Sequence, residues 1–135
     1  MISCQRKILR YEKFVTRKML QRFPDDIFVF GDNVERRGLG GQAAEMRGEP
    51  NAIGIVTKWY PSNNPDAFFS DRDYSHVFFI MMPDILRVYN EATAGRLIVW
   101  PQDGIGTGLA QLPKRAPKLF ELIETCRRVL DMTYK

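Results

Sequence analysis

Two glycine-rich segments are the parts of this sequence whose residue types best suit ligand chemistry. Residues 31–43 (GDNVERRGLGGQA) and residues 101–112 (PQDGIGTGLAQL) each follow an apolar run. Glycine lets backbone N–H groups approach a phosphate closely, and a helix that begins after the loop adds a partial positive charge. We therefore expect the two segments to hold a diphosphate together. The alternative is a pair of tight turns that bind nothing.

Neither segment is a standard nucleotide motif. The GxxxxGK[ST] pattern of a phosphate-binding P-loop is absent, and Gly104, Gly106 and Gly108 are spaced GxGxG rather than GxGxxG. Two side chains nearby could take part in catalysis. Lys58 ends an apolar run, and a lysine acts as a nucleophile only if burial or a neighbouring cation lowers its pKa; otherwise it is a solvated strand-end residue. Asp103 is either a general base or the first residue of an Asp-Gly turn.

Cysteine and histidine are too few for several kinds of site. Cys4, Cys126 and His76 are the only residues of these two types. They cannot form a zinc knuckle, a CxxC redox pair or a site with several histidines, so no metal and no cofactor are expected. Cys126 lies on the apolar stripe of the last predicted helix, which indicates a core position rather than a nucleophile.

The elements that must position the glycine segments follow from the hydrophobic pattern. Apolar runs at residues 27–30, 52–57 and 97–100 predict strands buried on both faces, and residues 7–11 predict a short first strand. Helices are expected after the N-cap Thr16, at residues 42–47, at 74–91 and at the end of the chain. Strands that alternate with helices predict an α/β layer fold with at least three parallel strands. Ligands of such sheets bind at the carboxyl ends of the strands, where both glycine segments begin.

Three local features are less regular. Residues 60–72 contain two prolines and two asparagines, which predicts a surface loop. Pro83 is expected to kink the helix at 74–91 or to start a second one. Glu45 and Arg47 could pair with each other or with a phosphate, and an ion pair at the surface is the simpler expectation.

Size and charge limit the classes of protein that the chain can represent. Its 135 residues suit one domain, and 44% hydrophobic residues are ordinary for a globular protein. No apolar run is long enough for a membrane span, and the amino terminus lacks the apolar stretch of a signal peptide, so we expect a cytoplasmic protein. The net charge of +4 arises from residues 1–23, which carry seven basic residues and one acidic residue. This segment could attract nucleic acid, but a solvated helix face is the simpler interpretation.

The order of these motifs resembles that of the macro domains, which bind ADP-ribose. The matching pieces are residues 27–33, Gly40-Gly41-Gln42-Ala43, residues 53–58 and residues 101–112, so the resemblance spans residues 25–130. The motifs FGDN, GGQAxExRGExNAxGI and DGIGTGLAxLP resemble a compact, often phage-associated branch, to which residues 1–23 also belong. The resemblance implies a single domain with three α/β/α layers around a mostly parallel sheet.

The resemblance also implies a role for each matching residue. Asn33 would contact the distal ribose, and Gly40, Gly41 and Gln42 would lie against that ribose and the nearby phosphate. Asp32 and Asp26 are both candidates for the acidic residue that binds adenine. The second loop would surround the diphosphate with backbone amides, and the hydroxyl of Thr107 would add a donor; this loop comprises Gly104, Ile105, Gly106, Thr107 and Gly108.

Catalysis is implied through Lys58. In macro domains that remove ADP-ribose from carboxylate side chains or DNA bases, a lysine at this position attacks C1″ of the opened ribose or stabilises charge there. The carboxylate-directed branch also has an aspartate just past the second loop. The corresponding residue here is Ala110, so the chain resembles the DNA-directed branch better.

Three functions remain open on the sequence. The favoured one is binding of ADP-ribose, or of an ADP-ribosylated macromolecule, with or without hydrolysis of the ADP-ribosyl bond. The second is a non-catalytic nucleic-acid-binding accessory protein that uses its basic amino-terminal segment. The third is a protein that sequesters a signalling nucleotide in the same site without turnover.

Overall fold

The computed structural model describes residues 6–134, so Cys4 lies outside the described part of the chain. Each predicted strand and helix is present. The elements in chain order are β1 (Leu9–Glu12), α1 (Arg17–Arg22), β2 (Ile27–Asn33), α2 (Ala43–Met46), β3 (Ala52–Lys58), the short 3₁₀ turns η1 (Pro65–Ala67) and η2 (Asp71–Asp73), α3 (Tyr74–Thr93), β4 (Ile98–Pro101), α4 (Leu112–Arg115) and α5 (Pro117–Asp131).

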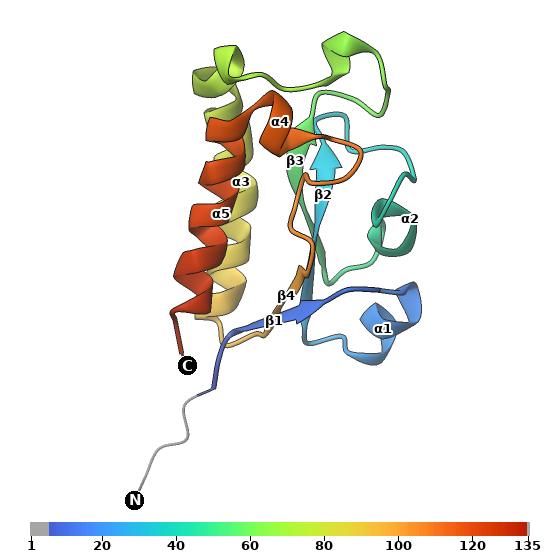
Figure 1. The fold of residues 1–135 in the computed structure, drawn as a ribbon. Coiled ribbons are helices and arrows are strands. Elements are labelled where there is room, and N and C mark those ends of the chain that lie inside the picture. The colour runs from blue at the N-terminus through green and yellow to red at the C-terminus, as the bar shows by residue number, and fades with distance from the viewer. Residues whose placement is uncertain (1–5, 135) are drawn as a thin grey trace, which may run out of the picture.

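The strands form one four-stranded sheet in the order β1-β4-β2-β3. All three neighbouring pairs are parallel, with Leu9 opposite Ile98, Ile27 also opposite Ile98, and Phe30 opposite Gly54. Helices α3 and α5 lie on one face of this sheet and α1 and α2 on the other (Figure 1). The predicted α/β fold with three layers is therefore confirmed, and the sheet is wholly parallel among the described strands.

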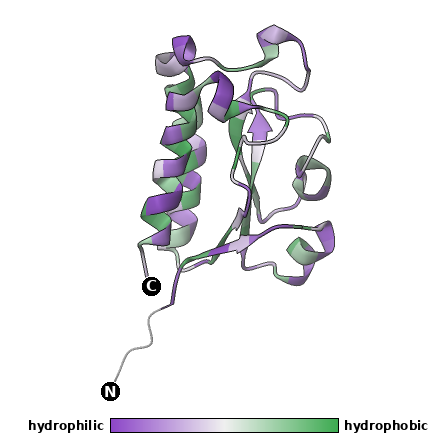
Figure 2. Cartoon of the chain, in the orientation of Figure 1, coloured by the Kyte–Doolittle hydropathy of each residue, from purple (hydrophilic) through white to green (hydrophobic). Residues whose placement is uncertain are grey.

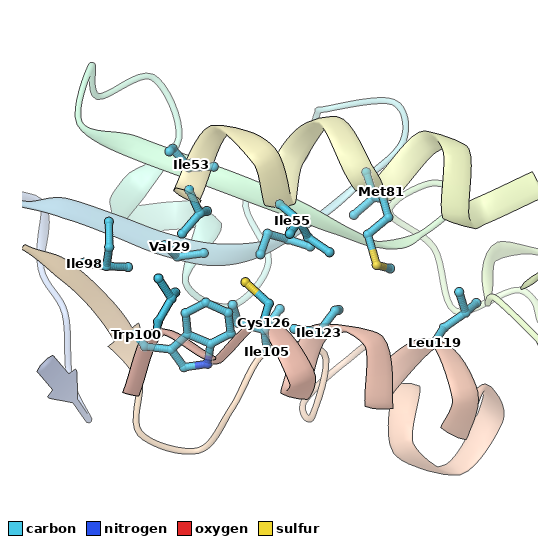
Figure 3. Close-up of a cluster of buried hydrophobic side chains, with 14 of the residues drawn as sticks. Val29, Ile53, Ile55, Met81, Ile98, Trp100, Ile105, Leu119, Ile123 and Cys126 are labelled. Carbon is cyan, nitrogen blue, oxygen red and sulfur yellow. The ribbon is translucent and has the colours of Figure 1, made fainter. Parts of the chain in front are cut away.

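The core has two parts because the strands are buried on both faces. Alternate residues of β2 point in opposite directions, so Val29 belongs to the cluster under α3 and α5, whereas Phe28 belongs to the cluster under α1 and α2. In Figure 3 the larger cluster fills the space between α3, α5 and the sheet, with Trp100 and Ile55 near its centre. Green, hydrophobic segments of the helices in Figure 2 turn toward the sheet, and purple segments turn outward.

The predicted N-cap is confirmed, one of the two alternatives at Pro83 is excluded, and one predicted ion pair is contradicted. Thr16 caps α1, because its hydroxyl oxygen accepts a hydrogen bond from the N–H of Met19 at 3.3 Å. Helix α3 continues through Pro83 as one element, so a second helix does not begin there. The predicted pair of Glu45 and Arg47 is also wrong: Glu45 accepts the backbone N–H of Arg17 at 2.8 Å, and Arg47 bonds elsewhere.

The buried carboxylate of Asp84 accepts a hydrogen bond from a backbone N–H at the edge strand β3. β3 is an edge strand, so some of its N–H groups point away from β2. Asp84 of α3 accepts the N–H of Val56 at 3.0 Å and is bound by Arg36 through two hydrogen bonds of 2.7 and 2.9 Å. Burial raises the pKa of Asp84 despite these partners. Among the helices within residues 6–134, none has the length and apolar character to cross a membrane.

Candidate functional site

The carboxyl ends of all four strands surround one cavity of about 420 Å³. Both predicted glycine segments line it, together with Lys58 at the end of β3 and Lys13 and Phe14 after β1. Figure 1 shows the loop between β4 and α4, in orange, passing the tips of β2 and β3. The structure thus brings most of the predicted site residues together, but Asp26 lines a second cavity at the opposite ends of the strands. Those that line the main cavity are Asp32, Asn33, Gly40, Gly41, Gln42, Lys58, Asp103, Gly104, Ile105, Gly106, Thr107 and Gly108.

The second loop presents a run of backbone N–H groups without protein acceptors. Within the described chain, no N–H of residues 105–110 donates a hydrogen bond to another residue. The turn that creates this run needs glycine at residue 106, where φ is +82° and a Cβ atom would lie 2.9 Å from Cβ of Leu112. The side chain of Ile105 anchors the loop in the larger core cluster, because it is only 1% exposed. Successive free amides of this kind form a concave site for an anion.

The polar side chains of the second loop take other roles than the sequence suggested. The hydroxyl of Thr107 donates to the carbonyl oxygen of Asp103 at 2.9 Å, so its proton is already bound within the loop. Asp103 is exposed and lies in a turn closed by the N–H of Gly104 and the carbonyl oxygen of Pro101, 3.0 Å apart. The geometry therefore supports the turn interpretation of Asp103.

The first loop has a similar set of amides, and a buried ion pair holds it. No N–H of residues 37–42 donates to an acceptor among residues 6–134. Nη2 of Arg47 lies 2.6 Å from Oδ1 of Asp32, and Nε of the same side chain donates to the carbonyl oxygen of Gly38 at 2.9 Å. Arg47 thereby joins the end of β2 to the loop that follows it.

Asp32 and Asn33 lie side by side but have different partners. Asp32 is 7% exposed, and its carboxylate contacts Arg47 and, at 3.5 Å, Arg36. Its charge is thus largely neutralised by the protein. Asn33 is also 7% exposed; its Nδ2 donates to the carbonyl oxygen of Arg37 at 2.7 Å, and its Oδ1 has no partner. A buried acceptor without a donor is uncommon, so Asn33 keeps capacity for one more hydrogen bond.

The two loops contact each other across the cavity. A Cβ atom at Gly40 would lie 3.1 Å from Cδ1 of Leu109. Leu109 and Phe14 are nevertheless 61% and 78% exposed, which leaves two large apolar side chains at the mouth of the site. An exposed aromatic ring at a pocket offers a flat face on which a base can stack. The sequence carried no signal for Phe14, because only the order of the strands places β1 beside β4.

Lys58 is buried and held at a definite position. It is 8% exposed, and its Nζ donates to the carbonyl oxygen of Ser62 at 2.5 Å. Burial and, to a smaller extent, the positive charge of Arg115 lower the pKa of Lys58 from its ordinary value. Burial and a neighbouring cation, either of which lowers the pKa of a lysine, are therefore both present, and Lys58 is not a solvated strand-end residue.

The basic amino-terminal segment does not form one continuous charged surface. Arg17 is bound by Glu49 at 2.8 Å and donates to two backbone carbonyls of the α2 region, those of residues 44 and 47. Arg10 lies 3.2 Å from Glu12. Lys13 lies at the main cavity, whereas Arg6 and Lys7 line a second cavity of about 360 Å³ at the opposite ends of the strands. Within residues 6–134, no group of three or more His, Cys, Asp and Glu side chains could hold a metal ion.

Comparison with known proteins places the chain in a family without assigning it an activity. No curated protein and no solved structure is significantly similar to it. A family model does match, and it covers residues 10–126, which include β2, β3, β4, all of β1 except Leu9, and both glycine loops. The chain therefore belongs to the family described as a family of unknown function (DUF7831).

Proposed function

We propose that this protein binds ADP-ribose, or a related nucleotide diphosphate, between the two glycine loops, and that Lys58 acts on an ADP-ribosyl bond there. One observation carries the proposal: within residues 6–134 the backbone N–H groups of residues 37–42 and 105–110 donate to no protein acceptor, and all of these residues except Leu39 line the same cavity. Amides in this arrangement bind phosphate oxygens without a cationic side chain. The cavity of about 420 Å³ is of the size that small-molecule ligands fill.

The remaining polar and aromatic groups suit the other parts of such a ligand. The Oδ1 of Asn33 has no partner within residues 6–134, but it is buried, so it would accept a hydrogen bond from a ribose hydroxyl only after the side chain turns toward the cavity. The ring of Phe14 is exposed at the mouth, where a base would stack. Asp32 is less suited to contact adenine because Arg47 already occupies its carboxylate. The resemblance to macro domains supports the same assignment of loops to diphosphate and ribose.

Hydrolysis adds one water molecule across the bond between C1″ of the ribose and the modified group. The hydroxyl ends on C1″ and the proton on the leaving group. If the neutral amine of Lys58 attacks C1″ of the opened ribose, the bond from C1″ to the modified group breaks as that group takes up a proton, and water then displaces the lysine from C1″ and restores the amine. The charged form would instead stabilise negative charge that develops beside C1″. A lowered pKa favours the first of these roles.

Isothermal titration calorimetry with ADP-ribose tests binding. We expect saturable heat with ADP-ribose and weaker binding of ribose 5-phosphate, which lacks the diphosphate and the base. The Arg87→Gln variant, altered at an exposed residue of α3, is the control and should bind as the wild type does. Absence of heat at millimolar ADP-ribose contradicts the proposal.

Incubation with ADP-ribosylated DNA and with ADP-ribosylated protein, followed by mass spectrometry, tests catalysis. Release of ADP-ribose that is lost in Lys58→Ala supports hydrolysis, and the preferred substrate identifies the modified group. Tight binding without release indicates sequestration instead. Unchanged release by Lys58→Ala removes the catalytic role of this lysine.

A further inference from the structure

Two cations lie against one aromatic ring beside the cavity. Nζ of Lys58 is 4.6 Å from the centroid of the Phe68 ring, and Cζ of Arg115 is 3.7 Å from the same centroid. The three residues come from different elements: Lys58 ends β3, Phe68 follows the turn η1, and Arg115 ends α4. Their meeting is therefore a property of the fold.

Neither cation has an anionic partner. Among residues 6–134, no carboxylate lies within ion-pair distance of Lys58 or Arg115, and their hydrogen bonds go to neutral oxygens. Lys58 donates to the carbonyl oxygen of Ser62, and Nε of Arg115 donates to Oε1 of Gln111 at 3.1 Å. The two positive charges thus lie over the same ring, and among the described residues no carboxylate is within ion-pair distance of either.

Like charges over one ring, with no anion in contact, favour loss of a proton from one of them. A guanidinium group does not lose its proton at any physiological pH, whereas a lysine ammonium group does. The repulsion therefore favours loss of the proton from Lys58. The nitrogen can donate to the carbonyl oxygen of Ser62 whether it is an ammonium group or a neutral amine, so it stays in place.

We propose that Arg115 is a positioning residue that acts through Lys58: its cation over the Phe68 ring favours loss of a proton from the Lys58 ammonium group and so increases the share of neutral amine that meets the substrate. The inference rests on the proposed role of Lys58 and names the residue that prepares it. Burial of Lys58 and the charge of Arg115 both lower its pKa, in that order of importance.

The other charged groups around the cavity do not replace Arg115. On β2 and α2, Asp32 and Arg47 neutralise each other, and in the first loop Arg37 is paired with Glu35 at 2.6 Å. Asp66, in the loop that carries Phe68, accepts a hydrogen bond from the hydroxyl of Tyr60. The cavity is also lined by Lys13 and Asp103, which follow β1 and β4. None of these groups lies on the Phe68 ring.

The position of Arg115 depends on the second glycine loop. Helix α4 starts directly after that loop, and the N–H of Leu112 donates to the carbonyl oxygen of Gly106 at 2.8 Å. The same short segment that presents amides to the cavity therefore also sets the cation beside Lys58.

Titration of Lys58 by NMR tests the proposal on the ligand-free protein. Lysine is labelled with ¹³C at Cε, and the Lys58 resonance is assigned by its absence from the Lys58→Met variant. In Arg115→Gln we expect the titration midpoint to rise by about half a pH unit or more, and in Arg115→Lys, which keeps the charge, to stay near the wild-type value. Added salt should raise the wild-type midpoint toward that of Arg115→Gln, because it screens the exposed guanidinium.

Arg87→Gln removes one charge from an exposed position on α3 and is the matched control. Circular dichroism establishes that each variant is folded. An unchanged midpoint in folded Arg115→Gln, or an equal rise in Arg87→Gln, overturns the proposal. Because no nucleotide is present, a failed calorimetric titration would contradict the proposed function and leave this result untouched.

Discussion

Arg47 and Asp32 are joined by two hydrogen bonds, 2.6 Å from Nη2 to Oδ1 and 3.2 Å from Nη1 to Oδ2. The pair links α2 to the end of β2 while Nε of the same arginine binds the first glycine loop. One side chain therefore fixes the strand end, the loop and the helix that follows it.

Replacement of Arg47 by Met should lower the free energy of unfolding by about 3 kcal/mol, because it leaves the buried carboxylate of Asp32 without its main partner. Urea unfolding followed by circular dichroism measures the loss. Arg37→Gln is the control, because it breaks an exposed ion pair in which the side chain of Arg37 is 64% exposed and that of Glu35 46%. Its free energy of unfolding should fall by less than about 1 kcal/mol. An equal fall in the free energy of unfolding of the two variants would show that the Asp32–Arg47 pair stabilises the fold no more than an exposed ion pair does.

Gly54→Ala should also destabilise the protein, by about 1–3 kcal/mol. A Cβ atom at residue 54 of β3 would lie 2.6 Å from Oδ2 of Asp32, and the ion pair prevents that side chain from moving away. Gly108→Ala provides the matched control, because its Cβ atom would meet nothing within 4 Å. Thermal unfolding of both variants separates steric conflict from a general effect of the substitution, and a Gly54→Ala protein as stable as Gly108→Ala would refute the contact.

The stability of the protein should depend on pH through Lys58. Its pKa is lowered in the folded state, so the unfolded chain binds more protons at pH values between the lowered pKa and the ordinary value of 10.5. Stability then rises with pH across that interval. The unfolding free energy of the wild type minus that of Lys58→Met should therefore increase with pH in this interval. Other groups with shifted pKa values, such as Tyr89 and Cys126, are present in both proteins, so their contributions cancel in the difference. A constant difference would contradict the lowered pKa.

Cys126 should be inert in the folded protein. It is 2% exposed, and burial raises its pKa to about 11, so little thiolate forms at pH 8. Iodoacetamide should leave the peptide that contains Cys126 unmodified under native conditions and modify it in 6 M urea, as read by mass spectrometry. Native modification at rates near those of a free thiol would place this residue outside the core.

The sequence was informative wherever a periodic pattern or a turn residue decided the local structure. Continuous apolar runs identified β2, β3 and β4, and the position of the glycine segments after them placed both loops at one edge of the sheet. The burial of Cys126 followed from the helical spacing of its neighbours.

Pairs of charged residues from separate elements were not predictable in this way. Arg36 and Asp84 lie 48 residues apart, and no spacing rule connects a loop residue with a position in the middle of α3. The contact of Arg115 with Phe68 likewise depends on how α4 follows the second loop. Arg47 appeared as a surface residue because its partner, Asp32, became buried only through the packing of α2 on β2.

The strand order has a consequence for the sequence of events in folding. β1 pairs only with β4 in this sheet, and everything from α1 to α3 lies between them in the chain. During synthesis on the ribosome, β2 and β3 can pair early. β1 precedes them in the chain but can enter the sheet only after β4 has left the ribosome. Such distant pairing raises the entropic cost of loop closure and slows folding. We expect the side of the cavity that holds Phe14 to assemble last, so the cavity would be complete only after β4 and the second glycine loop have left the ribosome.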